Sequence, residues 1–423
     1  MLRLTGRFVA VVAAVTLAAA ACSSSSKPSA GGSGNNGSTV PTTTGQSLTS
    51  VKVGVLADLT GAGAVTGNST VPGIKAGVGL ARTEGYNVSY VLADTQSTPA
   101  GVLAAAQRLV EQDHVFAVIM ISQLGFGAAQ YLTSHAIPVI GINVDGSEWL
   151  TAKNMFSVYG YADYSKVITT YGTIFKQLGG TVFGGAAYSI APASYLNNKS
   201  AAASAKLAGL KVGYDNTQLA YGTTNVGPVV LAMKNAGVDF VYPSIAQASS
   251  FAIVQGLEQA GVKFKALLPT GYGGDLTDAG PGSSHSAQNV YFTNIYEPVE
   301  MHTAATQRLV DALKTYAGVT TEPTLNEYSG YLSIDALVQG LKAAGANATP
   351  AQFINTMLGI TDYSAQGLFG GKTISFALQG RGSIFGAGDC TYVVQYQGTT
   401  FHLVQGMEPI CGTTVPDMTV TGP

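Results

Sequence analysis

The patterns that could carry chemistry begin with a glycine-rich turn near the start of the chain. Gly61 and Gly63 follow a strand-like run that ends at Leu59, and a helix-like segment comes next. A dinucleotide-binding turn needs the spacing G-x-G-x-x-G, which lets the backbone approach a pyrophosphate, and an acid about twenty residues further on. Gly67 is one residue late for that spacing, and Asp94 lies too far along the chain. A secreted nucleotide-dependent enzyme is therefore the least favoured alternative.

Other catalytic patterns are missing from the sequence. It has no nucleophile elbow G-x-S-x-G, and neither H-E-x-x-H nor S-x-x-K occurs in the context that its chemistry needs. The histidines are scattered without the spacing of metal ligands: His114, His135, His285, His302 and His402. We therefore expect no enzyme activity, no cofactor and no metal site.

Hydroxyls and amides stand where strand-like runs end. Ser122 ends one run and begins ISQLGFG, so its hydroxyl and the N–H groups that follow it, from Gln123 on, lie at the start of a helix. Such a position attracts anions, including carboxylates. Asn143 and Asp145 stand in the same place after the next run. The alternative is that Ser122 only caps its helix, and the sequence favours contact with a solute.

Tyrosines lie on loops of the same kind. Tyr159, Tyr188 and Tyr272 can wall a cleft, because each offers a flat apolar ring and one hydroxyl. Packing between lobes explains them equally well, and the sequence leaves these two interpretations balanced.

The elements that position these residues alternate between strand and helix patterns. Four early runs have the composition of buried strands: Val51–Leu59, Val88–Asp94, Phe116–Ser122 and Ile137–Asn143. Helical runs such as Pro99–Gln112 lie between them, and the rhythm repeats after Tyr161. This alternation predicts an α/β fold with two doubly wound parallel-sheet lobes. Ligands of such sheets bind beyond the carboxyl ends of the strands.

Length and charge limit the class of protein. The chain has 423 residues, of which 10% are charged, and a net charge of −2. A chain longer than about 300 residues outgrows a single core, which again favours two lobes. Without a basic stripe or a charge run, we expect no nucleic-acid partner.

The start of the chain has the pattern of a signal peptide over residues 1–21. Arg3 and Arg7 precede the apolar stretch Phe8–Ala21, which is short for a membrane span. It ends in LAAAAC, which is similar to the lipobox of bacterial lipoproteins, with Ala19 where Leu is usual. We expect Cys22 to be lipidated, with ordinary secretion as the alternative.

Residues 22–50 are rich in Ser, Gly and Thr, a composition typical of a flexible tether. A lipid anchor on Cys22 followed by this tether predicts a folded part held at the outer face of the cell membrane.

Two further cysteines flank a predicted hairpin. Cys390 and Cys411 stand on either side of TYVVQYQGTTFHLV, which contains two alternating strands around the turn QGTT. In an exported protein such a pair favours a disulfide. A metal site is the weaker alternative, because no CxxC or suitably spaced histidine accompanies the pair.

From Val51 to about Leu403 the chain resembles the leucine/isoleucine/valine-binding class of type I periplasmic binding proteins. The similar segments are KVGVLADLTGAGAVTG, YVLADTQSTPAGVLAAAQRLVEQDHVFAVI, MISQLGFGAAQYLTSHAIPVIGIN and GVDFVYPSIAQASSFAIVQGLEQAG. The resemblance implies a monomeric solute-binding protein of an ABC-type importer, whose lobes close over a small-molecule solute and present it to a membrane permease. A sensor subunit of a signalling system on the same fold is the alternative.

The resemblance also implies roles for single residues. Ser122 falls where the family binds a ligand carboxylate. Asp145 falls where a Thr or Ser usually meets the carboxylate and the ammonium, and Asn143 offers its carbonyl there. Thr66 stands where an aromatic often lines the first lobe. Tyr188, Gln247 and Tyr272 lie on second-lobe loops.

Two departures from the family pattern widen the expected class of solute. Amino-acid receptors usually place an acid near Tyr272, but PTGYGG has none before Asp275. Asp145 adds a negative charge beside the expected carboxylate. We therefore predict a small polar or amphipathic solute of the amino acid, amide or aromatic acid class.

The family crosses between its lobes three times, and we place these hinge crossings near Tyr159, Tyr296 and Gly370. The first lobe would then comprise residues 51–160 plus 297–370, and the second lobe residues 161–296 plus 371–423.

Overall fold

The computed structural model describes residues 48–278, 281–288, 290–382 and 386–423. The predicted signal peptide, Cys22 and most of the tether lie outside the described residues. Within the described ranges, no helix combines the length and the apolar composition that crossing a membrane requires.

The first sheet has five parallel strands in the order β2-β1-β3-β4-β5. They are β1 (Thr49–Ala57), β2 (Tyr86–Asp94), β3 (Ala117–Ile121), β4 (Val139–Gly141) and β5 (Met155–Ser157). Every residue of β3 is buried, as expected of a parallel strand with helices over both faces.

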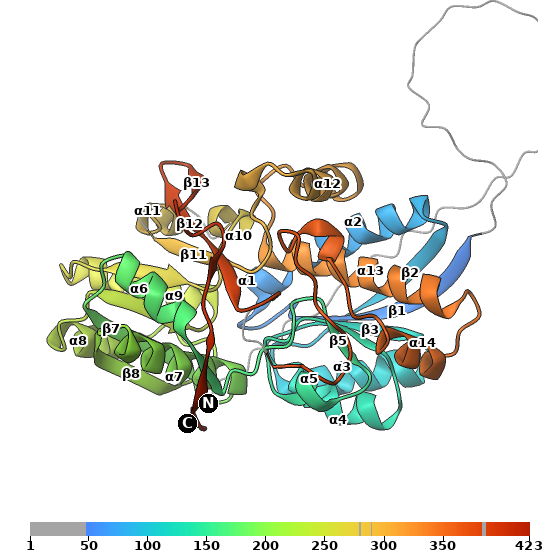
Figure 1. The fold of residues 1–423 in the computed structure, drawn as a ribbon, viewed down its shortest axis with the longest axis horizontal. Helices are drawn as coiled ribbons and strands as arrows, with labels where there is room; N and C mark the ends of the chain where they lie inside the picture. The colour runs from blue at the N-terminus through green and yellow to red at the C-terminus, as the bar shows by residue number, and fades with distance from the viewer. Residues whose placement is uncertain (1–47, 279–280, 289, 383–385) are drawn as a thin grey trace, which may run out of the picture. The chain divides into compact units, whose positions relative to one another are not determined.

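Helices lie on both sides of this sheet. Figure 1 shows α2 and α13 on one side and α3, α4 and α5 on the other. The helices of this lobe are α1 (Ala64–Gly67), α2 (Thr70–Thr83), α3 (Pro99–Glu111), α4 (Phe126–Ser134), α5 (Glu148–Thr151), α12 (Ala304–Ala312), α13 (Leu325–Ala344) and α14 (Pro350–Met357). The first sheet and these helices form the first lobe.

The second sheet is mixed and runs in the order β13-β12-β11-β10-β9-β7-β8, with β14 paired to β12. Its parallel strands are β7 (Val182–Tyr188), β8 (Lys211–Leu219), β9 (Phe240–Ser244), β10 (Lys265–Leu268) and β11 (Tyr291–Asn294). Its antiparallel edge consists of β12 (Cys390–Gln397), β13 (Thr400–Leu403) and β14 (Ile410–Cys411).

The second lobe adds helices to this sheet. They are α6 (Thr169–Gln177), α7 (Pro192–Leu207), α8 (Gly227–Asn235), α9 (Gln247–Gln259), α10 (Gly274–Asp278) and α11 (Pro281–Ser286). The predicted α/β architecture of two doubly wound lobes is therefore confirmed. The predicted disulfide is confirmed as well, because Cys390 and Cys411 are bonded and join β12 to β14.

One predicted helix begins later than the sequence suggested. The pattern predicts a helix from Ser165, whereas α6 begins at Thr169. The preceding strand β6 (Lys166–Ile168) pairs antiparallel with β15 (Thr414–Thr419) near the C-terminus. This distant pairing fixes the three residues as a strand and overrides their local helical pattern.

Within the described residues, the chain passes between the two lobes three times. The passes lie between β5 and β7, after β11 and before β12. The ring of Phe376 packs edge-on against Phe156 of the first lobe at 5.9 Å. Arg381 donates to the carbonyls of Trp149 and Ala152 in the same lobe. Contacts with the first lobe thus continue beyond Gly370, where the sequence analysis put the last crossing.

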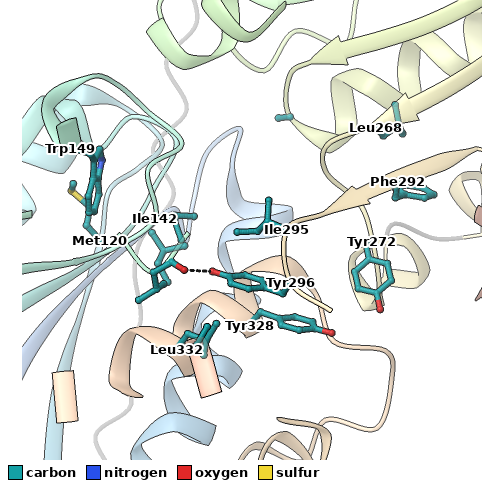
Figure 2. Packing of buried hydrophobic residues seen from close by; sticks show 14 of the residues in the cluster. Met120, Ile142, Trp149, Leu268, Tyr272, Phe292, Ile295, Tyr296, Tyr328 and Leu332 are labelled. Carbon is teal, nitrogen blue, oxygen red and sulfur yellow. Dashed lines mark hydrogen bonds between the residues drawn. The ribbon is translucent and has the colours of Figure 1, made fainter. Parts of the chain in front are cut away.

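An aromatic cluster joins two of these crossings. The hydroxyl of Tyr296, just after β11, donates to the carbonyl of Val158, just after β5, at 3.2 Å (Figure 2). The Tyr296 ring stacks parallel to Tyr328 of α13 at 5.4 Å and lies 5.6 Å from Phe369. Tyr296 is fully buried. The crossing segments therefore pack as part of the core.

Candidate functional site

A cavity lies where loops of both lobes meet beyond the carboxyl ends of the parallel strands. Its volume is about 140 Å³, counted as the space that the centre of a water-sized sphere can occupy, and part of it is open to solvent. Apolar side chains such as Ile121, Ile142 and Ile245 form part of its wall. This is the position at which open α/β sheets bind their ligands.

Five residues that the sequence singled out lie on the cavity wall: Thr66, Ser122, Gln123, Tyr159 and Tyr188. Each follows or ends a strand of its lobe, or lies on the short helix α1 that comes after β1. The other four do not line the cavity, and their contacts explain why.

Asn143 and Asp145 lie behind the wall, in the first lobe. The carbonyl of Asn143 accepts a hydrogen bond from the Tyr164 hydroxyl at 2.9 Å. Asp145 is fully buried and accepts a hydrogen bond from the indole N–H of Trp149 at 2.7 Å. Burial raises the pKa of Asp145 well above its usual value, and neighbouring Glu148 adds to this effect. Both residues are thus bound by the protein itself.

Gln247 and Tyr272 are held away from the cavity in the second lobe. The side-chain amide of Gln247 donates to the carbonyl of Asp275 at 2.7 Å. The hydroxyl of Tyr272 donates to Glu300 at 2.8 Å, and its ring packs against Phe401 at 4.9 Å. Tyr272 is therefore part of the packing between strand ends and the β12–β13 hairpin.

Asp58 is a wall residue that the sequence analysis did not select. It follows β1 directly and is only 3% exposed. Its carboxylate accepts hydrogen bonds from the hydroxyls of Thr95 and Ser122 and from the backbone N–H of Gln123. Burial raises the pKa of Asp58, while these hydrogen bonds oppose the rise. Its position directly after a strand is the sequence feature that could have identified it as a wall residue.

Tyrosines form much of the remaining surface. The cavity is lined by a group that we call the tyrosine wall: Tyr159, Tyr164, Tyr171, Tyr188 and Tyr242. Of these, the sequence had proposed Tyr159 and Tyr188 as cleft residues.

Hydrogen bonds fix the second-lobe part of the tyrosine wall. Tyr171 donates to the side-chain carbonyl of Asn197, and the amide of Asn197 donates to Tyr242 at 3.0 Å. Tyr188 and Ser249 share a hydrogen bond of 2.7 Å. Burial raises the pKa of Tyr242 to about 12, so its hydroxyl stays protonated near neutral pH. The tyrosine hydroxyls in this part of the wall are therefore held by hydrogen bonds, and that of Tyr242 is uncharged.

Contacts between the lobes close one side of the cavity. The hydroxyl of Tyr221, after β8, donates to the side-chain carbonyl of Gln123 at 3.1 Å. Gly222, next to it, approaches Ala62 so closely that a Cβ at this glycine would overlap the Ala62 side chain. The backbone N–H of Ala193 donates to the carbonyl of Asp145 at 3.2 Å. The two lobes are thus in a closed arrangement.

The charged side chains described on the cavity wall are acidic. Among its lining residues in the described part of the chain, Asp58 and Asp275 are acidic and none is lysine, arginine or histidine. Across the described ranges, no group of three or more His, Cys, Asp or Glu side chains is arranged to hold a metal ion. The arrangement can enclose and orient a small molecule.

Solved structures with this fold come from several organisms. An ABC transporter solute-binding protein from R. palustris, in complex with benzoate, has a TM-score of 0.70 at 16% identity, covering 88% of this chain and 99% of its own. A leucine-binding protein from Thermotoga maritima has a TM-score of 0.70 at 16% identity, covering 84% and 97%. A fatty acid ABC transporter substrate-binding protein from Thermomonospora curvata has a TM-score of 0.69 at 16% identity, covering 87% and 93%.

At these identities the structural likeness establishes the fold. A search of curated protein sequences gave no match. The model of one sequence family, described as "Periplasmic binding protein", matches residues 50–400. That range covers the strands of the first sheet from Ser50 on and the strands β7 to β12 of the second sheet. The chain therefore belongs to the periplasmic binding protein family.

Proposed function

We propose that the protein is the extracytoplasmic solute-binding subunit of an ABC-type importer. The observation that carries this proposal is the cavity enclosed between the lobes, with Ser122 and Asp58 on one side and Tyr171 and Tyr242 on the other. Membership of the periplasmic binding protein family supports the same role. The proposal assigns no catalytic step to the chain.

Binding would follow from hinge motion of the lobes. In an open form, solvent reaches the wall residues, and each lobe offers half of the solute's contacts. Closure brings Tyr221 to Gln123 and Gly222 to Ala62, the contacts that close the cavity in this structure. A permease would then recognise the closed form, and a separate subunit would hydrolyse ATP.

The solute that suits this cavity is small and amphipathic. Isoleucine side chains and tyrosine rings offer apolar contact, and hydroxyl and carboxylate groups offer polar contact. The ligands named for the similar structures, benzoate, leucine and a fatty acid, have comparable amphipathic character.

The position of the protein in the cell is part of the proposal. Export by the signal peptide and lipidation of Cys22 would leave the folded lobes tethered outside the membrane, beside the permease. Incorporation of labelled palmitate into the wild-type chain, and its loss in Cys22→Ser, tests the anchor.

A thermal-shift screen tests the solute-binding function. The full chain is heated with single members of a library of amino acids, amides, amines and aromatic acids. A solute at one hundred times its Kd should stabilise the folded state by about 2.7 kcal/mol. Ser122→Ala should reduce the stabilisation by the solute, because the Ser122 hydroxyl holds the Asp58 carboxylate on the cavity wall. If no member stabilises the protein and Ser122→Ala changes nothing, the proposed site is wrong.

A further inference from the structure

We infer that the cavity selects a solute with a cationic amine head group and excludes a carboxylate from the Ser122 position. This inference rests on the proposed solute-binding function and narrows it to one class of solute. It departs from the aromatic acids and α-amino acids that the sequence had kept open.

The hydrogen-bond donors at the end of β3 already have partners within the protein. The Ser122 hydroxyl donates to one oxygen of Asp58 at 2.7 Å, and the backbone N–H of Gln123 donates to the other at 3.3 Å. The N–H of Leu124 donates to the Ser122 hydroxyl at 3.2 Å. The groups that could hold a solute carboxylate are therefore already bound to a carboxylate of the protein.

The cavity wall carries acidic side chains. Asp58 of the first lobe and Asp275 of the second lobe both line the cavity, and both are at least 95% buried. None of the wall residues that the structure describes is lysine, arginine or histidine. An anion placed beside Asp58 would meet a like charge at reduced dielectric, whereas a cation would be attracted to it.

Arg381 is a basic residue whose contacts lie in the first lobe, outside the cavity. Its guanidinium lies 4.0 Å from the centre of the Tyr161 ring and donates to the carbonyls of Trp149 and Ala152. These contacts hold it away from the cavity, whose lining does not include it. It therefore does not serve as a counter-ion for a solute carboxylate.

The tyrosine wall offers aromatic rings to the solute. Aromatic faces attract alkyl ammonium groups through the negative charge of the ring face. Tyr171 and Tyr242 lie 5.0 Å apart, and the ring of Tyr159 is held edge-on to Tyr296 at 6.4 Å. Acidic groups together with fixed tyrosine rings suit an ammonium head on an apolar or aromatic body.

Matched head groups on one body provide the test. Isothermal titration in phosphate buffer at pH 7 compares tyramine, 4-hydroxyphenylacetate and tyrosine, and then 3-methylbutylamine, 3-methylbutanoate and leucine. In at least one series the amine should bind at least tenfold more tightly than both the acid and the amino acid. Amine buffers are avoided because they would compete for the same site.

A charge-neutralising variant gives a second measurement. Asp58→Asn should weaken binding of the amine at least tenfold and should strengthen binding of the acid. Asp311→Asn, an exposed acid on α12 outside the cavity, should leave both unchanged. If Asp58→Asn does not fold, the wild-type comparison still decides the inference.

The outcomes separate the inference from the function on which it rests. Tighter binding of an acid or an amino acid overturns the preference for amines and leaves the solute-binding function standing. If no member of either series binds, the result counts against the preference for amines and against the solute-binding function.

Discussion

The hydroxyl of Ser122 donates a hydrogen bond of 2.7 Å to the carboxylate of Asp58. The family resemblance assigned Ser122 to the carboxylate of a solute, and here it binds a carboxylate of the same lobe. Asp58 is held by this bond, by Thr95 and by the backbone of Gln123. An acidic group is thereby fixed on the cavity wall.

Replacement of Ser122 by alanine should destabilise the protein most when Asp58 is ionised. A hydrogen bond to a charged group contributes about 1.5–3 kcal/mol. We expect a loss of that size in the unfolding free energy at pH 7, measured with urea, and a smaller loss at pH 4. Ser333→Ala is the control, because Ser333 donates to the neutral carbonyl of Ser329 at 2.7 Å. A loss for Ser122→Ala that does not vary with pH would contradict this explanation.

Binding of an amine solute should depend on pH through Asp58. Burial raises the pKa of Asp58 above its ordinary value of 3.8, and nearby Asp94 adds to the rise. Affinity should therefore fall as the pH is lowered through the raised pKa, because protonation removes the charge that attracts the amine. Tyr221 also faces Asp58, and its own pKa is raised, so it stays neutral in this range. Titrations from pH 4 to 8 should show this fall in wild type and lose it in Asp58→Asn.

Asp145→Asn should stabilise the protein at neutral pH. The pKa of Asp145 is raised well above 3.8 by burial and by Glu148, so the folded state holds a proton that the unfolded chain releases. The stabilisation of the folded state that the protonated Asp145 provides is fully present below pH 3.8. It is lost as the pH rises through the raised pKa of the folded state. Asparagine can still accept from Trp149 and can donate to Glu148.

Urea unfolding at several pH values between 4 and 8 checks this prediction. The stabilities of Asp145→Asn and wild type should lie closest at the acidic end and separate as the pH rises, with the variant higher. Parallel curves would mean that Asp145 does not titrate in this way.

A methyl group at Gly222 should oppose closure of the lobes. Gly222 has a φ of +72° and would place a Cβ against Ala62 of the other lobe, whereas Gly237, with a φ of +68°, has open space around it. Both Gly→Ala changes carry a similar backbone cost of about 1 kcal/mol. We expect Gly222→Ala to weaken solute binding at least tenfold and Gly237→Ala to leave it within about twofold. Equal solute affinities of Gly222→Ala and Gly237→Ala would mean that solute binding does not require the closed arrangement of the lobes.

Local patterns account for what the sequence predicted well. The strand–helix rhythm gave both lobes, and the alternating residues on either side of QGTT gave the β12–β13 hairpin beside the Cys390–Cys411 bond. Ser122 and Tyr188 lie on the cavity wall because each stands at a strand end, and this position follows from the parallel sheet alone.

Distant contacts account for what the sequence missed. Asp145 turns away because the Trp149 indole binds it, and Tyr272 turns away because Glu300 does. Tyr171 belongs to a helix whose start is set by the pairing of β6 with β15, and this pairing joins residues far apart in the sequence, such as Ile168 and Thr414. No periodicity or motif in the sequence indicates these contacts. The residues of the cavity wall could therefore be predicted only in part.

The most direct test of the account is a crystal structure of the protein with the solute that stabilises it most. The account predicts density for one solute in the cavity between Asp58 and Tyr171, with its nitrogen toward the carboxylate of Asp58 and its body against the tyrosine wall. A solute bound only on the surface of one lobe, or one that directs a carboxylate to Ser122, would contradict it.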